Sequence, residues 1–496
     1  MSKILFWVGT NFTHYCIANV FQKKMDDEIF GIFDVTNKPR KYFESQKLVD
    51  FKKIWFYHDM MKEIDAQVDL KFLKDFEERY NIPLTTLAYS ERVFMEYNEF
   101  YRFNTKQILK ILELECKFYE EVLSEVNPDF IFMYAPYFHH EVLFFKLCKA
   151  KNIKVLELNA TRFGSQGVIG FDDELKKFDE FIPTNNVRTF EELREYFEEK
   201  HIVKQNLNVI KRTHGSIRNN IESAIQYFIF SDSENIKTHY TYFGRNKFNV
   251  FKNYLNDVFR IKKRKKFIDT EFVKDVPEGN YILYPLQTEA ESALLIDSPL
   301  FVDPVDIVKK ITKSMPVDYQ LLVKEHPIQE ARSWRSVDTY KKIIETPGVI
   351  PIHPDAKITE ILKKASLVIT VSSSVGLDSL FYEVPSLMFA QNTYSIIPSV
   401  GKIRDVGSLS EYIKRMLNTE VKERDLEKYI QFSEKISFDF DPAGFTQDLN
   451  DFFHFSGKLV DVNIEENQMK EFLVMEKEKL EILVTEYIKK MNVNDN

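Results

Sequence analysis

The chain has 496 residues, of which 44% are hydrophobic and 29% are charged. These proportions are typical of a folded globular protein and exclude an intrinsically disordered one, and the length predicts two domains or more. The formal net charge of −8 argues against a protein that coats nucleic acid. Three cysteines lie far apart without metal-ligand spacing, which disfavours a zinc site or a disulfide framework and fits a reducing cytoplasm.

The apolar run at residues 4–8 is only as long as a strand, and no small-residue cleavage site follows it, so we expect no signal peptide. No apolar run approaches the roughly 18 residues of a spanning helix. We therefore expect the protein to touch a membrane only from outside.

Residues 1–170 alternate short apolar runs with helical patterns. The predicted strands cover residues 3–9, 53–58, 130–136 and 153–159. Between them, apolar spacings of three and four predict a helix over 108–126, which "NPD" ends, and another over 140–152. Such alternation predicts a parallel sheet covered on both faces.

Residues 171–278 are polar and helix-prone, and we interpret them as a helical insertion with an interdomain linker. The segment contains a basic run, "RIKKRKKF", at 260–267. A solvated helix face explains such a run most simply, and a membrane surface or an anionic ligand is the alternative.

Strand–helix alternation returns over residues 279–445. Strands are predicted at 281–287, 319–327, 348–355, 367–371 and 386–390. Asp303 and Pro304 predict the start of one helix, and Asp355 is expected to cap another. The pattern predicts a doubly wound, nucleotide-binding α/β domain. Residues 446–496 form a last segment, whose apolar stripe over 465–491 predicts one long amphipathic helix packed on the body.

Polar residues follow three predicted strands of this second α/β region. Gln287 follows the first, Lys324 and His326 end the second, and Ser372, Ser373 and Ser374 follow the fourth. Because ligands of parallel sheets bind outside the carboxyl ends of the strands, these positions are candidates for one site.

The serine cluster at a strand-to-helix turn offers N–H and hydroxyl donors to an anion, above all a phosphate. Gly376 would let the ligand approach the backbone, although N-capping by Ser374 explains one serine without a ligand. His326 could donate a hydrogen bond or a proton to the phosphate, and Lys324 could add charge. Asp378 could accept from ribose hydroxyls or be an ordinary first-turn acid.

Neither a dinucleotide fingerprint nor a P-loop is present, and no His/Cys/Asp cluster indicates a metal site. We therefore predict no cofactor and no metal.

Three stretches carry a family resemblance: "YILYPLQTEAES", "LLVKEHP" and "VIPIHPDAKITEILKKASLVITVSSSVGLDSLFYEVPSLMF". In this order they resemble the capsule polysaccharide synthesis glycosyltransferases, which include bacterial transferases that use CMP-activated Kdo. The His-Pro and serine signals are also similar to those of bacterial sialyltransferases. The resemblance covers about 280–400 and extends to 128–168.

The resemblance implies two Rossmann-like domains facing across a cleft (the GT-B class), with 1–170 binding the acceptor and 279–445 the nucleotide sugar. His326 and the three serines would contact the donor phosphate, His353 would lie near the base, and Asp378 would take the ribose position, where the family usually has Glu. The acidic catalytic signal of the sialyltransferases has no counterpart, because "FDDE" at 171–174 lacks the glycine. The catalytic base stays open.

For that base we consider His14 first, in the loop expected after the first strand, and then His139 and His140. For each of these histidines a structural role is the alternative.

The expected function is metal-independent transfer of a sugar, from CMP-Kdo or a related CMP-sugar, to a surface polysaccharide or its lipid-linked acceptor. Alternatives are a CDP-polyol phosphotransferase, a nucleotide-sugar 2-epimerase and a non-catalytic capsule-assembly protein. The expected location is the cytoplasm, with peripheral contact at the inner face of the cell membrane left open.

Overall fold

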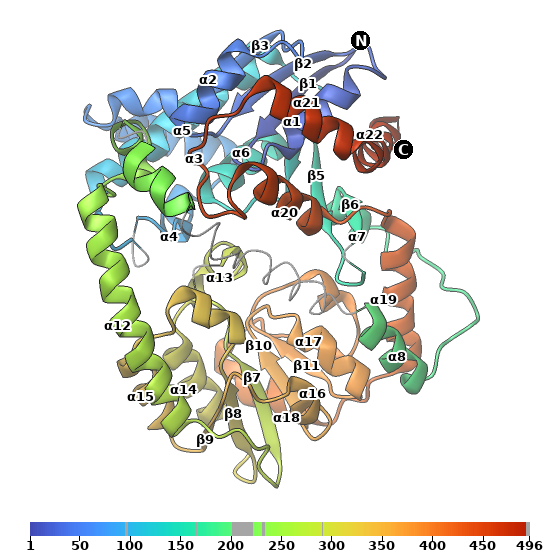
Figure 1. The fold of residues 1–496 in the computed structure, drawn as a ribbon. Coiled ribbons are helices and arrows are strands. Elements are labelled where there is room, and N and C mark those ends of the chain that lie inside the picture. Colours follow the sequence, from blue (N-terminus) through green and yellow to red (C-terminus); the bar gives the residue numbers. More distant parts are fainter. Residues whose placement is uncertain (95–97, 165, 201–221, 231–233, 290, 493–496) are drawn as a thin grey trace. The chain divides into compact units, whose positions relative to one another are not determined.

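The computed structural model describes residues 1–492 apart from 95–97, 165, 201–221, 231–233 and 290. The chain forms two compact units (Figure 1). The first unit comprises Met1–Asp179, Lys200–Asn249 and Ser433–Asn496, and the second comprises Glu180–Glu199 and Val250–Phe432. Part of the predicted helical insertion lies outside the described residues.

Within its described residues, the first unit contains a six-stranded sheet in the order β3-β2-β1-β4-β5-β6. Its strands are β1 (Lys3–Val8), β2 (Glu28–Phe33), β3 (Lys53–Phe56), β4 (Phe130–Tyr134), β5 (Lys154–Ala160) and β6 (Gly167–Ile169). All neighbours are parallel except β5 and β6, which pair antiparallel. The strand order is that of a doubly wound dinucleotide-type fold, whose order reverses between β1 and β4.

The second unit repeats this topology in the part of the chain that the structure describes, with six parallel strands ordered β12-β11-β10-β7-β8-β9. These strands are β7 (Tyr281–Pro285), β8 (Gln320–Lys324), β9 (Val349–Ile352), β10 (Leu367–Thr370), β11 (Ser386–Met388) and β12 (Val400–Lys402). Its order reverses between β7 and β10. The expectation of two Rossmann-like α/β domains is confirmed.

The helices cover both faces of the two sheets, as continuous apolar strands require. In the first half of the chain they are α1 (Thr13–Phe21), α2 (Asn37–Ser45), α3 (Leu70–Tyr80), α4 (Leu84–Ser90), α5 (Thr105–Val126), α6 (His139–Ala150), α7 (Phe171–Leu175), α8 (Phe190–Lys200) and α11 (Asn235–Thr238). Then follow α12 (Lys247–Glu271), α13 (Ser292–Leu295), α14 (Pro304–Ser314), α15 (Val337–Ile344), α16 (Ile358–Leu362), α17 (Val375–Asp378), α18 (Leu409–Leu417) and α19 (Glu423–Ile436). The last are α20 (Pro442–Phe453), α21 (Glu466–Met475) and α22 (Lys477–Asn492).

The compact units do not follow the predicted boundaries at 170/171, 278/279 and 445/446. The chain returns to the first unit at Ser433, because its last helices share that unit's core. In Figure 1, α20, α21 and α22 lie beside α1, and Leu480, Leu483, Val484 and Tyr487 are fully buried in a cluster with strand residues of the first sheet.

Three local predictions need correction. The helix expected over 465–491 is broken at Glu476, where backbone angles leave the helical range between α21 and α22. Asp355 does not cap α16; its N–H donates to His353 Nδ1, and Lys357 occupies the N-cap position. Asp303 does cap α14, as predicted, by accepting from the N–H of Val305 at 2.8 Å. Among the described helices, none is long and apolar enough to span a membrane.

Candidate functional site

A pocket of about 660 Å³ opens at the carboxyl edge of the first sheet. Its walls come from the segments that follow five neighbouring strands, including Thr10 after β1, Asp34 after β2, His58 after β3 and Asn159 in β5. The first turn of α6 and part of α20 complete the lining. The pocket therefore spans the β1/β4 reversal, where sheets of this topology bind ligands.

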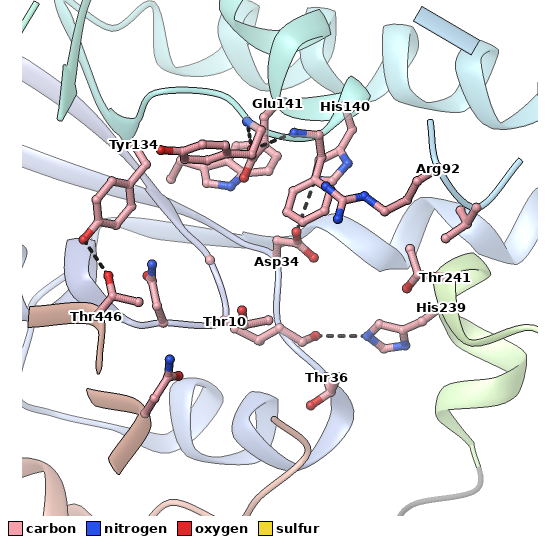
Figure 2. A pocket seen from close by; sticks show the side chains of 18 of the residues that line it. Thr10, Asp34, Thr36, Arg92, Tyr134, His140, Glu141, His239, Thr241 and Thr446 are labelled. Atoms are coloured by element: carbon pink, nitrogen blue, oxygen red, sulfur yellow. Dashed lines mark hydrogen bonds and ion pairs between the residues drawn. The ribbon is translucent and has the colours of Figure 1, made fainter. Parts of the chain in front are cut away.

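Asp34 lies at the centre of this pocket (Figure 2). One carboxylate oxygen is 2.9 Å from His58 Nε2, and the other is 3.2 Å from His140 Nε2. Burial would raise the pKa of Asp34, but the two imidazole hydrogen bonds outweigh burial and lower it. Burial conversely disfavours charge on His140, and its bond to Asp34 raises its pKa nonetheless. Asp34 therefore stays ionised at neutral pH.

Glu141 is a second carboxyl group in the pocket and has a different environment. One of its oxygens accepts from the backbone N–H groups of Tyr137 and Phe138, at 2.8 and 3.2 Å, which satisfies the start of α6. The other oxygen, Oε1, has no hydrogen bond with any described residue and faces the pocket (Figure 2). Burial raises the pKa of Glu141. Two carboxyl groups whose pKa values are driven apart are suited to different roles in one reaction.

His139 lies behind the pocket and is fully buried between two glutamates. Its Nδ1 is 2.5 Å from Glu91, its Nε2 is 2.9 Å from Glu115, and Tyr57 donates to Glu115 at 2.5 Å. Burial would lower the pKa of His139, but Glu115 and Glu91 raise it to about 10. The imidazolium is thus held as the cation of a buried ion network.

Potential ligand atoms of Glu91, His139 and His140 all lie within 4.8 Å of one another. Imidazole and carboxylate are a donor set that could hold a divalent metal. However, both ring nitrogens of His139 are already hydrogen-bonded to carboxylates. We therefore interpret the cluster as ion pairs and assign it no metal.

The second unit gathers its polar groups at the carboxyl ends of β7, β8 and β10. The side-chain amide of Gln287, after β7, lies 2.9 Å from Ser372 Oγ, after β10. With its oxygen toward the turn, the amide accepts from the N–H groups of Ser372 and Ser373, each at 2.9 Å. Gln287 and the serine turn thus meet at the point where the strand order reverses.

His326 lies at the same edge, after β8, which is the neighbour of β7 on the other side from β10. Two strand spacings, about 10 Å, separate β8 from β10. His326 Nδ1 accepts from the N–H of Ile328 at 3.2 Å, so the remaining ring proton is on Nε2, which has no described partner. Burial lowers the pKa of His326 and favours this neutral, donating tautomer.

Lys324 and His353 are occupied by other protein groups. Lys324 Nζ is buried and donates to the carbonyl of Pro354 at 2.8 Å, and burial lowers its pKa to about 8. His353 is 1% exposed, with Asp269 on Nε2 at 3.1 Å and the Asp355 N–H on Nδ1 at 3.1 Å. Neither side chain is directed at open space beside the serine turn.

Within the serine turn, Ser373 rather than Ser374 bonds the helix start, accepting from the Val375 N–H at 3.3 Å. Ser374 makes no hydrogen bond to a described residue through its hydroxyl or N–H group. The close approach at Gly376 is made by the hydroxyl of Tyr394, which lies 2.6 Å from where a Cβ would be.

Two further predicted site residues are buried. Asp378 in α17 is only 7% exposed. His14 lies inside α1, not in a loop, and is 1% exposed. Its Nε2 is 3.1 Å from the Tyr487 hydroxyl, and burial lowers its pKa to about 3. His14 does not line the pocket, whereas His140 does.

Sequence reasoning missed Asp34, His58 and Glu141. Asp34 directly follows the run "EIFGIF", which was not recognised as a strand because Gly31 interrupts it. Glu141 belongs to "HHE" at the start of a predicted helix, which is a readable first-turn acid signal. His58 was assigned to the end of a strand and begins a 3₁₀ turn instead.

Comparison with family models finds one match, to the family described as capsule polysaccharide biosynthesis protein, over residues 180–399. Residues 180–399 belong to the capsule polysaccharide biosynthesis family. This segment contains the Gln287, His326 and serine-turn positions, and the predicted family resemblance is confirmed there. No match was found among curated proteins.

Three solved structures illustrate the fold likeness of this capsule-family chain. UDP-GlcNAc 2-epimerase from Methanocaldococcus jannaschii is 14% identical, covers 87% of this chain and 99% of its own, and superposes with a TM-score of 0.26. KpsC, a beta Kdo 2,7 transferase of Thermosulfurimonas dismutans, is 11% identical over 63% and 78%, with a TM-score of 0.29. The calicheamicin glycosyltransferase CalG4 is 10% identical over 88% and 94%, with a TM-score of 0.26. Superpositions at this level carry no argument about substrate.

Proposed function

We propose that this protein is a glycosyltransferase of capsule or other surface polysaccharide synthesis. It transfers a sugar from a nucleotide-activated donor, CMP-Kdo or a related CMP-sugar, to a polysaccharide or its lipid-linked acceptor on the cytoplasmic side. The observation that carries the proposal is the family match over 180–399, which includes the polar groups at the β7/β10 reversal.

In the second unit, the donor phosphate would bind between His326 and Ser374. Each has a hydrogen-bond donor without a protein partner among the described residues, and both lie at the same sheet edge. A phosphate group and its substituents can bridge two strand spacings of about 10 Å. Neutral donors aimed at the leaving phosphate stabilise its developing charge without a cation. We assign Lys324 and His353 to supporting this edge, and Gln287 to holding the turn.

In the first unit, Glu141 would act as the general base. As the acceptor oxygen bonds to the anomeric carbon, Glu141 Oε1 takes the hydroxyl proton, and the bond from that carbon to the nucleotide phosphate breaks. A carboxyl group with a raised pKa in a partly closed pocket is suited to this transfer. Arg92 and Arg245 also line the pocket, which fits an acidic sugar or acceptor.

A panel of CMP-, CDP- and UDP-linked donors tests the proposal, with and without purified surface polysaccharide. We expect acceptor-dependent release of CMP and a thermal shift with CMP. Release of CMP together with a polyol phosphate product would identify a phosphotransferase, and an epimerised UDP-sugar a 2-epimerase. No thermal shift with CMP, CDP, UDP or GDP would indicate a non-catalytic protein.

A further inference from the structure

Helix α12 exposes a continuous apolar row on one face. Phe248, Leu255 and Phe259 are 73%, 43% and 72% exposed. Phe251, at 49%, lies between them. Spacings of three and four residues place all four side chains on the same face of a helix. Exposed large apolar side chains gathered in one row mark a contact surface more often than isolated ones do.

Lysines continue the same face toward the end of α12. Lys262 and Lys266 extend the spacing of three and four, and Lys263 lies beside them. All three are exposed, and none forms an ion pair with a described residue. Their neighbour Lys265 differs, because it pairs with Asp269 at 3.2 Å. We call Phe248, Phe251, Leu255, Phe259, Lys262 and Lys266 the α12 stripe.

The opposite face of α12 is anchored in the second unit, which fixes the direction of the stripe. Ile261 and Ile268 pack in a cluster with Trp334 and Tyr340. Arg264 donates to the carbonyls of Ser333 and Trp334, both at 2.8 Å. Figure 1 shows α12 as one long helix beside α15, which contains Tyr340. Rotating the stripe inward would break these contacts, so it stays on the surface.

We propose that the α12 stripe docks the protein on the surface of an anionic lipid bilayer. The aromatic and leucine side chains enter the boundary between headgroups and acyl chains, and the lysines contact lipid phosphates. Charge complementarity favours this occupant, since the stripe has only positive charge while the whole chain has a net charge of −8. The inference does not depend on the donor sugar or on the proposed chemistry.

Co-sedimentation of the full chain with vesicles tests this proposal. We expect binding to phosphatidylglycerol/phosphatidylcholine vesicles at low salt, and little binding to phosphatidylcholine alone. The double variant Lys262→Glu/Lys266→Glu should bind more weakly by roughly 25-fold or more, since each lysine near such a surface contributes about fivefold. The variant Phe248→Ser/Phe259→Ser should lose tenfold or more (a rough figure).

Matched controls lie elsewhere on the second unit. Leu300→Ser/Val317→Ser removes apolar side chains that are 85% and 103% exposed, and Lys309→Glu/Lys313→Glu makes the same charge change in α14. Both controls should bind like wild type. Three outcomes would overturn the proposal: no vesicle binding, equal binding to both vesicle types, or stripe variants that change the oligomeric state while vesicle binding persists.

Discussion

The carboxyl edges of the two sheets have the same topology and opposite chemistry. In the first unit, Asp34, Glu141 and three histidines gather in or behind an enclosed pocket, with pKa values shifted in both directions. In the second unit, the groups at the reversal point are an amide, hydroxyls, backbone N–H groups and a neutral imidazole. The first arrangement can move protons, and the second can hold an anion without adding charge. One architecture thus supplies two functions through the residues that follow its strands.

Exchanging Glu141 for Gln should give the largest effect on this comparison. Glutamine keeps the oxygen that accepts from Tyr137 and Phe138, so α6 should still form, but it cannot take a proton. We expect sugar transfer to fall by about 10²–10⁴-fold, with nucleotide binding unchanged. Initial rates and a CMP thermal shift would measure both. A Glu141→Gln enzyme with near wild-type turnover would remove the first unit from proton transfer.

The variant His326→Ala should affect the other edge. Loss of the Nε2–H donor is expected to lower kcat/KM by about 10- to 100-fold, since a hydrogen bond to a charged group contributes about 1.5–3 kcal/mol. Nucleotide binding should weaken as well, which distinguishes this variant from Glu141→Gln. Ile328 loses one hydrogen bond to the ring, so an unchanged melting temperature without ligand is the necessary control. Full activity would refute the assigned role.

Glu157→Gln should sharpen the contrast between paired and unpaired carboxyl groups in the first unit. Glu157 in β5 is 4% exposed, and its Oε2 has no partner among the described residues. Burial raises its pKa from 4.5 to about 7, so the folded state holds a proton that the unfolded chain loses earlier. The wild type should therefore lose stability as pH rises from about 4.5 to 7.

The glutamine variant lacks this loss, and at pH 8 it should be more stable than wild type by about 1–3 kcal/mol. Urea denaturation at pH 5 and pH 8 would measure the difference. Parallel stability curves for the two proteins would show that Glu157 is ionised in the folded state.

Much of the fold was predictable because its signals are local. Continuous apolar runs identified β1, β4, β5 and β7, and a regular spacing identified α5. Weak signals failed: β2 contains Gly31 and was missed, and the short edge strand β12 has few apolar residues. The break at Glu476 was also missed, because the apolar spacing continues across it.

The candidate sites were only half predictable. Gln287, His326 and the serine turn follow strands whose punctuation is clear in sequence, so their shared edge could be inferred. Asp34 and Glu141 lie far apart in the chain, and each looks ordinary alone. They became a site when the parallel strands brought their ends together. His14 failed as a candidate because α1 begins before it and buries it.

The sequence by itself determined two doubly wound domains and the polar strand ends of the second one, because strand runs, helix spacing and turn residues act over a few neighbours. Tertiary structure alone decided which unit receives the last helices, which histidines are buried, and which carboxyl groups are paired. These outcomes depend on contacts between residues distant in the chain, and the pKa of a carboxyl or imidazole group follows from burial and partners rather than from its own identity.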